Sequence, residues 1–155
     1  IAAGARVHVS SSSDAKNDAA IAMGCTSGVR YDMEDFSQAL KRCSPRGFDV
    51  VVDGAGGNQV GPILNRMAPA GRFVFYGGTA GKWPPILPQR LFFKQVSILA
   101  STMGSPRDFE RMLAFVDTHQ IRPLVDQVFT LQDGAEAFRY LEGGSQMGKV
   151  VLSIG

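Results

Sequence analysis

Hydrophobic residues along the chain follow two alternating patterns, short apolar runs typical of strands and a spacing of three to four residues typical of helices. The first segments of the chain predict a strand around Val7 and Val9, followed by a helix that ends at Gly24. Further strands are expected at 28–31, 48–53, 72–76, 96–101, 125–130 and 149–153. Further helices are expected at 34–43, 60–67, from 105 onward and at about 133–142. Alternation of strands and helices predicts an α/β fold with a parallel sheet.

Three segments carry a specific expectation about burial. The uniformly apolar run Val50-Val51-Val52 predicts a strand covered on both faces. Two later helices are each expected to bury one apolar stripe, made of Val60, Ile63, Leu64 and Met67 in the first and of Phe109, Met112, Leu113 and Val116 in the second. Pro69 and Gly71 are expected to end the first of these helices, and Ser105-Pro106 to begin the second.

Composition narrows the class of protein. The 155 residues are 45% hydrophobic and 19% charged, which favours a folded chain with a real core. The net charge of +2 is spread over both signs, so we expect no nucleic-acid partner. No apolar run is long enough to cross a bilayer, so we expect no membrane partner.

The cysteines and histidines predict no metal site. Cys25 and Cys43 show no paired spacing, which favours free thiols in a reducing compartment and a cytoplasmic protein. His8 and His119 are isolated in the sequence and are expected to be structural.

Four consecutive serines, Ser10–Ser13, follow the first strand and precede a helix with Lys16 in its first turn. Hydroxyl groups beside a helix N-terminus and a nearby lysine favour an anion. In nucleotide-binding βαβ units an acidic residue at this point holds the ribose of NAD, whereas hydroxyl and basic residues accept the 2′-phosphate of NADP. No acidic residue lies within the serine run, so the sequence favours NADP. The alternative is an ordinary loop in which Ser13 or Asp14 caps the helix.

Taken in order, these segments resemble the medium-chain dehydrogenase/reductase superfamily, which includes zinc-type alcohol dehydrogenases and NADPH-dependent quinone oxidoreductases. The resemblance covers essentially the whole chain. The matching stretches are Gly4-Ala5-Arg6-Val7, the serine run to Lys16, Val51-Val52-Asp53 with its glycines, Ala70-Gly71-Arg72, Tyr76-Gly77-Gly78, residues 99–105, and Gly148-Lys149-Val150-Val151-Leu152.

The resemblance implies a set of cofactor-binding residues. Ser12, Lys16 and Tyr31 have the spacing of the residues that surround the 2′-phosphate in the NADPH branch. Ser11 stands where the NAD branch keeps an acidic residue. The path from adenosine to nicotinamide would be lined by Gly54, Ala55, Gly56, Tyr76, Gly77, Gly78, Thr79, Ser101 and Thr102, and the pyrophosphate would meet Lys149. For Lys149, a solvent-facing strand residue is the alternative.

The same resemblance implies an incomplete fold. The family's first strand and its glycine-rich turn would precede Ile1, whose segment looks like the tail of the following helix. We therefore expect an incomplete Rossmann-type doubly wound parallel sheet lacking its first strand over residues 1–123. Residues 124–155 would form a strand–helix–strand segment belonging to the catalytic domain. The sheet should show a gap between the family's second and fourth strands, or its edges should be covered by a neighbouring chain.

The expected function is the cofactor-binding portion of an NADPH-dependent oxidoreductase acting on a carbonyl or alcohol, a quinone or an activated alkene. No residue has the spacing of a catalytic acid or base, so this chain alone is expected to be inactive, and any zinc would be held by the N-terminal part. A homodimer through the strand near 95–101 is expected. Two alternatives remain: a non-catalytic nucleotide-sensing or dimerisation module, and an adenosylmethionine-dependent methyltransferase-like domain based on the glycines after Asp53.

Overall fold

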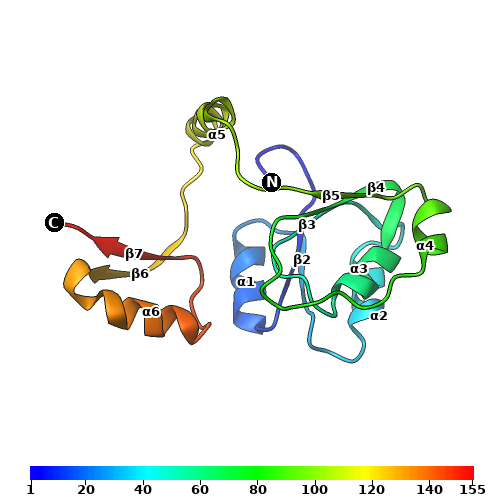
Figure 1. Cartoon of the computed structure of the whole chain (residues 1–155), viewed down its shortest axis with the longest axis horizontal. Helices are drawn as coiled ribbons and strands as arrows, with labels where there is room; N and C mark the ends of the chain where they lie inside the picture. The colour runs from blue at the N-terminus through cyan, green and yellow to red at the C-terminus, as the bar shows by residue number, and fades with distance from the viewer. The chain divides into compact units, whose positions relative to one another are not determined.

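Parallel strands joined by helices make up the computed structural model, which describes residues 1–155 (Figure 1). The chain divides into two compact units, Ile1–Met103 and Gly104–Gly155. No helix in either unit combines the length and the apolar character that a membrane-spanning segment requires. The α/β fold with parallel strands is as predicted.

The first unit begins with two strands and two helices. Their bounds are His8–Ser11 for β1, Asp14–Ala22 for α1, Ser27–Arg30 for β2 and Phe36–Cys43 for α2. β1 and β2 form a parallel ladder in which Ser11 lies opposite Arg30. Gly28 allows close packing of α1 on β2, because a Cβ at this position would lie 2.5 Å from the Cβ of Asn17.

A second sheet follows in the same unit. Its elements are β3 (Phe48–Asp53), α3 (Val60–Asn65), β4 (Met67–Phe75), α4 (Pro88–Phe92) and β5 (Ser97–Ala100). The three strands are parallel and lie in the order β3-β4-β5. Because parallel strands end at the same edge, this order brings the loops after Asp53, Phe75 and Ala100 together.

The two sheets of this unit are not joined by hydrogen bonds between strands. β1 and β3 take the places of the family's second and fourth strands in chain order, so the predicted gap is confirmed. The ring of His8 on β1 packs edge-on against Phe48 at the start of β3, with 5.6 Å between ring centroids.

The core of the first unit lies between α2, α3 and one face of the second sheet. Phe73, Met67 and Val60 are its largest fully buried side chains. Phe36, Ala39 and Leu40 are buried on one face of α2, as the sequence predicts. The ring of Trp83 covers this core, since it packs edge-on against Phe73 and Phe75.

Two expectations for the first unit are wrong, and one helix was not predicted. Val50 and Val52 are 49% and 68% exposed, so β3 is covered on one face only. α3 ends at Asn65, and β4 runs through Pro69 and Gly71, because β4 already pairs with Phe48 at Met67 and continues past a register shift. Met67 is buried as expected, but from a strand. The short helix α4 was not predicted.

The second unit contains α5 (Pro106–Thr118), β6 (Val125–Thr130), the 3-10 turn η1 (Leu131–Asp133), α6 (Gly134–Glu142) and β7 (Lys149–Ser153). β6 and β7 form a parallel ladder. Ser105 caps α5 as predicted, in a capping box with Asp108.

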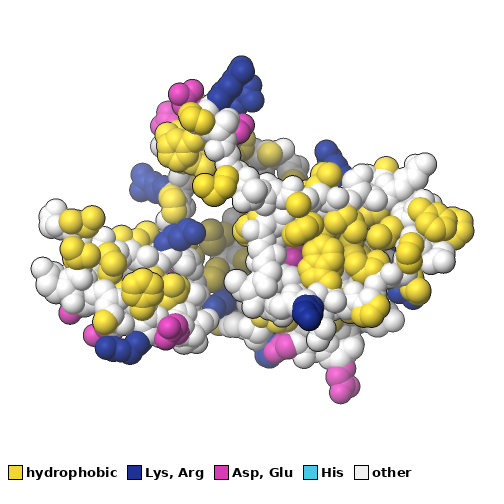
Figure 2. All heavy atoms as spheres, in the orientation of Figure 1, with side chains coloured by type: hydrophobic (Ala, Val, Ile, Leu, Met, Phe, Trp, Pro, Cys, Tyr) yellow, Lys and Arg dark blue, Asp and Glu magenta, His cyan; other side chains and the backbone are white.

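The expected burial of the α5 stripe is wrong, because Phe109, Met112 and Leu113 are 49–58% exposed. Figure 2 shows hydrophobic side chains gathered on one side of this helix and charged side chains on another. The amphipathic pattern is present, yet nothing in its own unit covers the apolar side. The division into domains at residues 123 and 124 remains a prediction.

Candidate functional site

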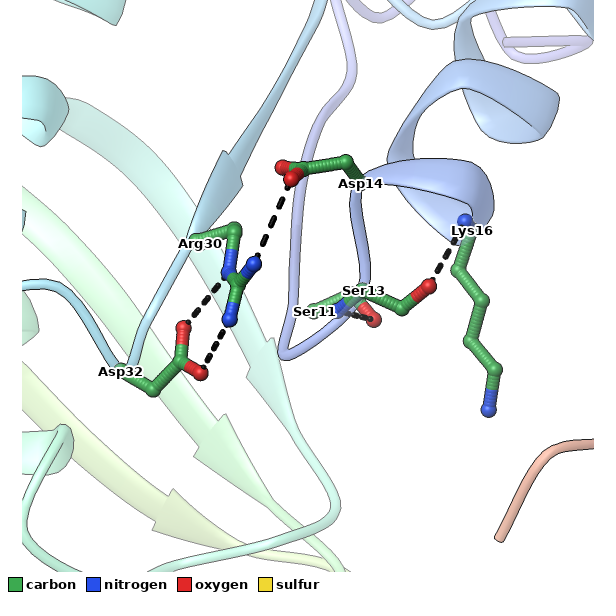
Figure 3. Close-up of polar contacts among 6 residues, drawn as sticks. All are labelled: Ser11, Ser13, Asp14, Lys16, Arg30 and Asp32. Carbon is green, nitrogen blue, oxygen red and sulfur yellow. Dashed lines mark hydrogen bonds and ion pairs between the residues drawn. The ribbon is translucent and has the colours of Figure 1, made fainter.

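The serine run continues from β1 into the start of α1. Ser13 is the N-cap residue of α1, and its hydroxyl accepts the backbone N–H of Lys16 at 3.4 Å (Figure 3). The hydroxyl of Ser11 accepts the backbone N–H of Ser13 at 3.2 Å. The capping alternative is therefore confirmed for Ser13. Ser12, which stands between these two residues in the sequence, is exposed.

Tyr31 lies beside the same loop. It follows β2, and its backbone N–H donates to the carbonyl oxygen of Ser11 at 3.2 Å. Its side chain is 39% exposed. The ladder between β1 and β2 thus brings Ser11, Ser12 and Tyr31 to one edge, while α1 carries Lys16. In Figure 3 the Lys16 side chain extends away from Ser11 and Arg30. Convergence of Ser12, Lys16 and Tyr31 on one phosphate remains a prediction.

Arg30 is a charged residue of this edge that the sequence reasoning missed. Its Nε and Nη2 donate to the two carboxylate oxygens of Asp32 at 2.9 and 2.6 Å. Its Nη1 donates to Asp14 in the first turn of α1 at 3.3 Å (Figure 3). The hydrogen bond from Arg30 holds the pKa of the Asp32 carboxyl below its usual range, and hydrogen bonds to Asp32 and Asp14 raise the pKa of Arg30. A basic residue at the end of a predicted strand, next to Tyr31, was the available signal.

The loops after β3 and β4 pack directly against each other. A Cβ on Gly54 would lie 2.6 Å from the Tyr76 hydroxyl, and a Cβ on Gly77 would overlap the carbonyl oxygen of Gly54. The backbone N–H of Ala80 donates to the carbonyl oxygen of Ala55 at 2.8 Å. The contact at Gly77 requires glycine on steric grounds, because it is a contact with backbone, and together these contacts bring the predicted segments 54–56 and 76–79 close to each other.

Asp53 closes the first of these loops. Its carboxylate is 9% exposed and accepts the backbone N–H of Gly56 at 2.9 Å. Gly56 has a φ of 71°, a conformation that favours glycine. The turn is therefore held by its own side-chain-to-backbone hydrogen bond.

The remaining predicted residues lie in two places. Ser101 follows β5, and its backbone N–H donates to the carbonyl oxygen of Phe75 at 2.9 Å, which brings 101–102 to the edge of the glycine loops. Lys149 begins β7 in the second unit, where its side chain is exposed and its backbone N–H donates to Leu124. Its role at a pyrophosphate remains a prediction. The structure contains no group of three or more His, Cys, Asp or Glu side chains that could hold a metal ion.

Comparison with known proteins gives a consistent result. Residues 23–152 match a family described as zinc-binding dehydrogenase. The chain is 33% identical to the zinc-type alcohol dehydrogenase-like protein YogA of Leptosphaeria maculans, over 99% of this chain and 45% of that protein. It is 29% identical to quinone oxidoreductase-like protein 2 of Bos taurus, over 97% of this chain and 46% of that protein. The chain therefore spans less than half the length of these relatives.

Solved structures agree with these matches. An NAD-dependent alcohol dehydrogenase is 33% identical, with a TM-score of 0.86 over 98% of this chain and 45% of that chain. A putative alcohol dehydrogenase from Sinorhizobium meliloti 1021 is 30% identical, with a TM-score of 0.88 over 97% of this chain and 44% of that chain.

Proposed function

This chain belongs to the zinc-binding dehydrogenase family of the medium-chain dehydrogenase/reductase superfamily, as its cofactor-binding part, and we propose that it binds NADPH for an enzyme that reduces a carbonyl, quinone or activated alkene. The reverse reaction would oxidise an alcohol. The bound nicotinamide supplies the hydride, and residues of this chain bind and orient the cofactor. Any zinc would be held by residues outside this chain.

The observation that carries the NADPH proposal is the shared edge of β1 and β2. Tyr31 is hydrogen-bonded through its backbone to Ser11, and Ser12 is exposed beside it. Lys16 follows one turn into α1, whose N-terminus favours negative charge. Hydroxyl, phenol and ammonium groups are all hydrogen-bond donors to a phosphate. None of these groups repels the 2′-phosphate, whereas an acidic residue at position 11 would.

Binding of NAD is the competing possibility, since one similar structure is an NAD-dependent alcohol dehydrogenase. Asp14 and Asp32 also bring two carboxylates to this edge, and both accept hydrogen bonds from Arg30. Because Arg30 offsets part of their charge, the edge still accepts an anion when Lys16 adds its positive charge. This balance makes Lys16 the residue on which the preference between cofactors depends.

The rest of the dinucleotide would follow the loops after β3, β4 and β5. Gly77 lets the loop after β4 pack directly on the backbone of the loop after β3, and Ser101 and Thr102 add hydroxyl donors. This supports binding outside the carboxyl ends of the strands, the usual place in open α/β sheets. The methyltransferase alternative has no comparable support, because Asp53 is engaged with Gly56 and the family is one of dehydrogenases.

We further propose that the protein forms a homodimer through β5. This strand is at the edge of its sheet, so one side of its backbone is available for pairing with a second copy. The non-catalytic alternative predicts such a dimer without any dinucleotide binding. Measuring the oligomeric state and NADPH binding on the same sample separates the two.

The decisive experiment compares the affinities of the full-length protein for NADPH and NADH by calorimetry, with a Lys16→Ala variant. We expect the variant to lose about 1.5 to 3 kcal/mol of binding free energy for NADPH, the value of one charge-assisted contact, and little for NADH. Lys41→Ala removes the same charge from the exposed side of α2 and is the matched control. Equal losses for both cofactors would reject the assignment of Lys16 to the 2′-phosphate.

A further inference from the structure

Arg30 lies on the same face of the β1–β2 ladder as Ser11, the serine that ends β1. The two residues are direct partners across the ladder, and both are half-buried. Side chains alternate between the two faces along a strand, and residues paired across a ladder project to the same face. The fold therefore places a guanidinium on the face of the serine that the proposed function assigns to the adenosine end of the cofactor.

Two carboxylates hold Arg30 with unequal strength (Figure 3). Asp32 accepts two hydrogen bonds from it, at 2.9 and 2.6 Å, and the Asp32 side chain is 40% exposed. Asp14 accepts one hydrogen bond, from Nη1 at 3.3 Å, and its side chain is 72% exposed. A single long hydrogen bond to a solvated carboxylate contributes little free energy. Asp14 is therefore the partner that another anion can replace at small cost.

Asp14 is not the cap of α1. The N-cap residue is Ser13, whose hydroxyl accepts the backbone N–H of Lys16. Asp14 is the acidic residue of the first turn, where the positive end of the helix dipole favours negative charge. Its carboxylate thus supplies, from within the chain, the kind of charge that a bound phosphate would bring to the same guanidinium and the same helix end.

Release of Asp14 would leave donors on Arg30 for a ligand without loosening the side chain. A guanidinium has five N–H groups, of which two bind Asp32 and one binds Asp14. The two hydrogen bonds to Asp32 fix the plane of the guanidinium. In Figure 3 the Lys16 side chain extends away from Arg30, so these two cations would approach a phosphate from different directions.

We propose that Arg30 is a further specificity-determining residue of the cofactor site, and that Asp14 holds it until the 2′-phosphate of NADPH takes the place of the Asp14 carboxylate. This inference rests on the proposed binding of NADPH. Nη1 of Arg30 passes from Asp14 to a phosphate oxygen, while Asp32 keeps both of its hydrogen bonds. NADH carries a neutral hydroxyl at this position and does not displace a carboxylate, so Asp14 opposes the binding of NADPH alone.

The test measures the affinities of the full-length protein for NADPH and NADH by calorimetry. Asp14→Asn removes the competing charge, so we expect it to tighten NADPH binding by roughly threefold and to leave NADH binding unchanged, because the exposed contact that it removes is weak. Asp18→Asn is the matched control, since it removes the same charge from an exposed position of α1 that makes no contact with Arg30. Its effect on NADPH binding should be smaller.

A double-mutant cycle separates transfer of Arg30 from simple repulsion. In an Arg30→Gln background, Asp14→Asn should give almost no gain in NADPH affinity, because no guanidinium remains to be released. If Asp14 acted only by repelling the phosphate, the gain would be larger without Arg30, since nothing would offset the charge of Asp14. The two explanations therefore predict opposite signs for the coupling between these residues.

The outcomes distinguish this inference from the proposed function. A parent protein that binds NADPH no more tightly than NADH would refute the proposed function, and the inference with it. A parent that prefers NADPH, loses that preference in Lys16→Ala and shows an equal or larger Asp14→Asn gain without Arg30 would overturn only the inference. Weaker NADH binding in Asp14→Asn would also overturn it, because Asp14 would then be a ligand of the NAD ribose.

Discussion

Arg30 and Asp32 form a bidentate ion pair at the end of β2, in which Nε donates to one carboxylate oxygen at 2.9 Å and Nη2 donates to the other at 2.6 Å. The same guanidinium donates to Asp14 at 3.3 Å. One cation thus joins the first turn of α1 to the residue after Tyr31. This geometry holds two carboxylates against one guanidinium where β2 ends and α1 begins.

Replacing Arg30 by Ala should weaken the binding of NADPH more than that of NADH. The change leaves Asp14 and Asp32 without their shared cation, so they repel the 2′-phosphate more strongly. Because the groups are exposed, we expect an effect on the order of fivefold at low salt that shrinks as salt is added. Titration of the full-length protein with each cofactor measures it, and Arg46→Ala is the charge-matched control. A loss that is equal for both cofactors would contradict this role.

The Asp32 carboxyl should titrate below its ordinary range in the folded chain. Its pKa is lowered mainly by the hydrogen bond from Arg30. A lowered pKa in the folded state means that the pair stabilises the fold above the unfolded pKa, and that this contribution is lost as pH falls through the folded pKa. Carboxyl chemical shifts measured by NMR against pH check this expectation. Arg30→Gln should return the midpoint of Asp32 toward its ordinary value, and an unchanged midpoint would exclude the ion pair in solution.

Much of the fold could be predicted from residues whose effect is local. Ser105-Pro106 begins α5 because a cap and a first-turn proline act within one turn. Phe36, Ala39 and Leu40 are buried because their spacing selects one face of a helix.

The sequence-based predictions fail where the burial or secondary structure of a segment depends on a distant part of the chain that packs against it. Val50 and Val52 have the composition of a doubly covered strand, yet burial requires another element over that face. Pro69 and Gly71 look like helix terminators, but the register of β4 against β3 includes them in a strand. Arg30 was missed for the same reason, because its partner Asp14 is brought near by the β1–β2 ladder.

The contact between Gly54 and Gly77 predicts an asymmetric response to alanine. A Cβ at Gly77 would overlap the carbonyl oxygen of Gly54, whereas a Cβ at Gly78 would meet nothing within 4 Å. Gly77→Ala should therefore destabilise the chain by about 1 to 3 kcal/mol, because backbone must shift. Gly78→Ala should change stability by less than about 0.5 kcal/mol. Urea unfolding of both variants provides the comparison, and equal midpoints would contradict the close packing of the two loops.

Tyr140 should ionise above its ordinary range. Its hydroxyl donates to the Asp126 carboxylate at 2.6 Å, and this hydrogen bond is the main cause that raises the pKa of the phenol. A raised pKa in the folded state means that the contact stabilises the fold fully below the unfolded pKa, and that this contribution is lost as pH rises through the folded pKa. The second unit should therefore become less stable in alkaline solution, since the ionised phenol cannot donate and is repelled by the carboxylate.

An absorbance titration of tyrosinate in the parent chain and in Tyr140→Phe isolates the signal of this residue by difference. We expect the difference curve to have its midpoint above pH of about 10, the ordinary value for tyrosine. Asp126→Asn removes the charge but keeps a hydrogen-bond acceptor, so it should move that midpoint downward. If the difference curve lies at the ordinary value in both backgrounds, the Tyr140–Asp126 hydrogen bond does not persist in solution, and the ring contact of Phe129 with Tyr140 would have to hold Tyr140 in place without it.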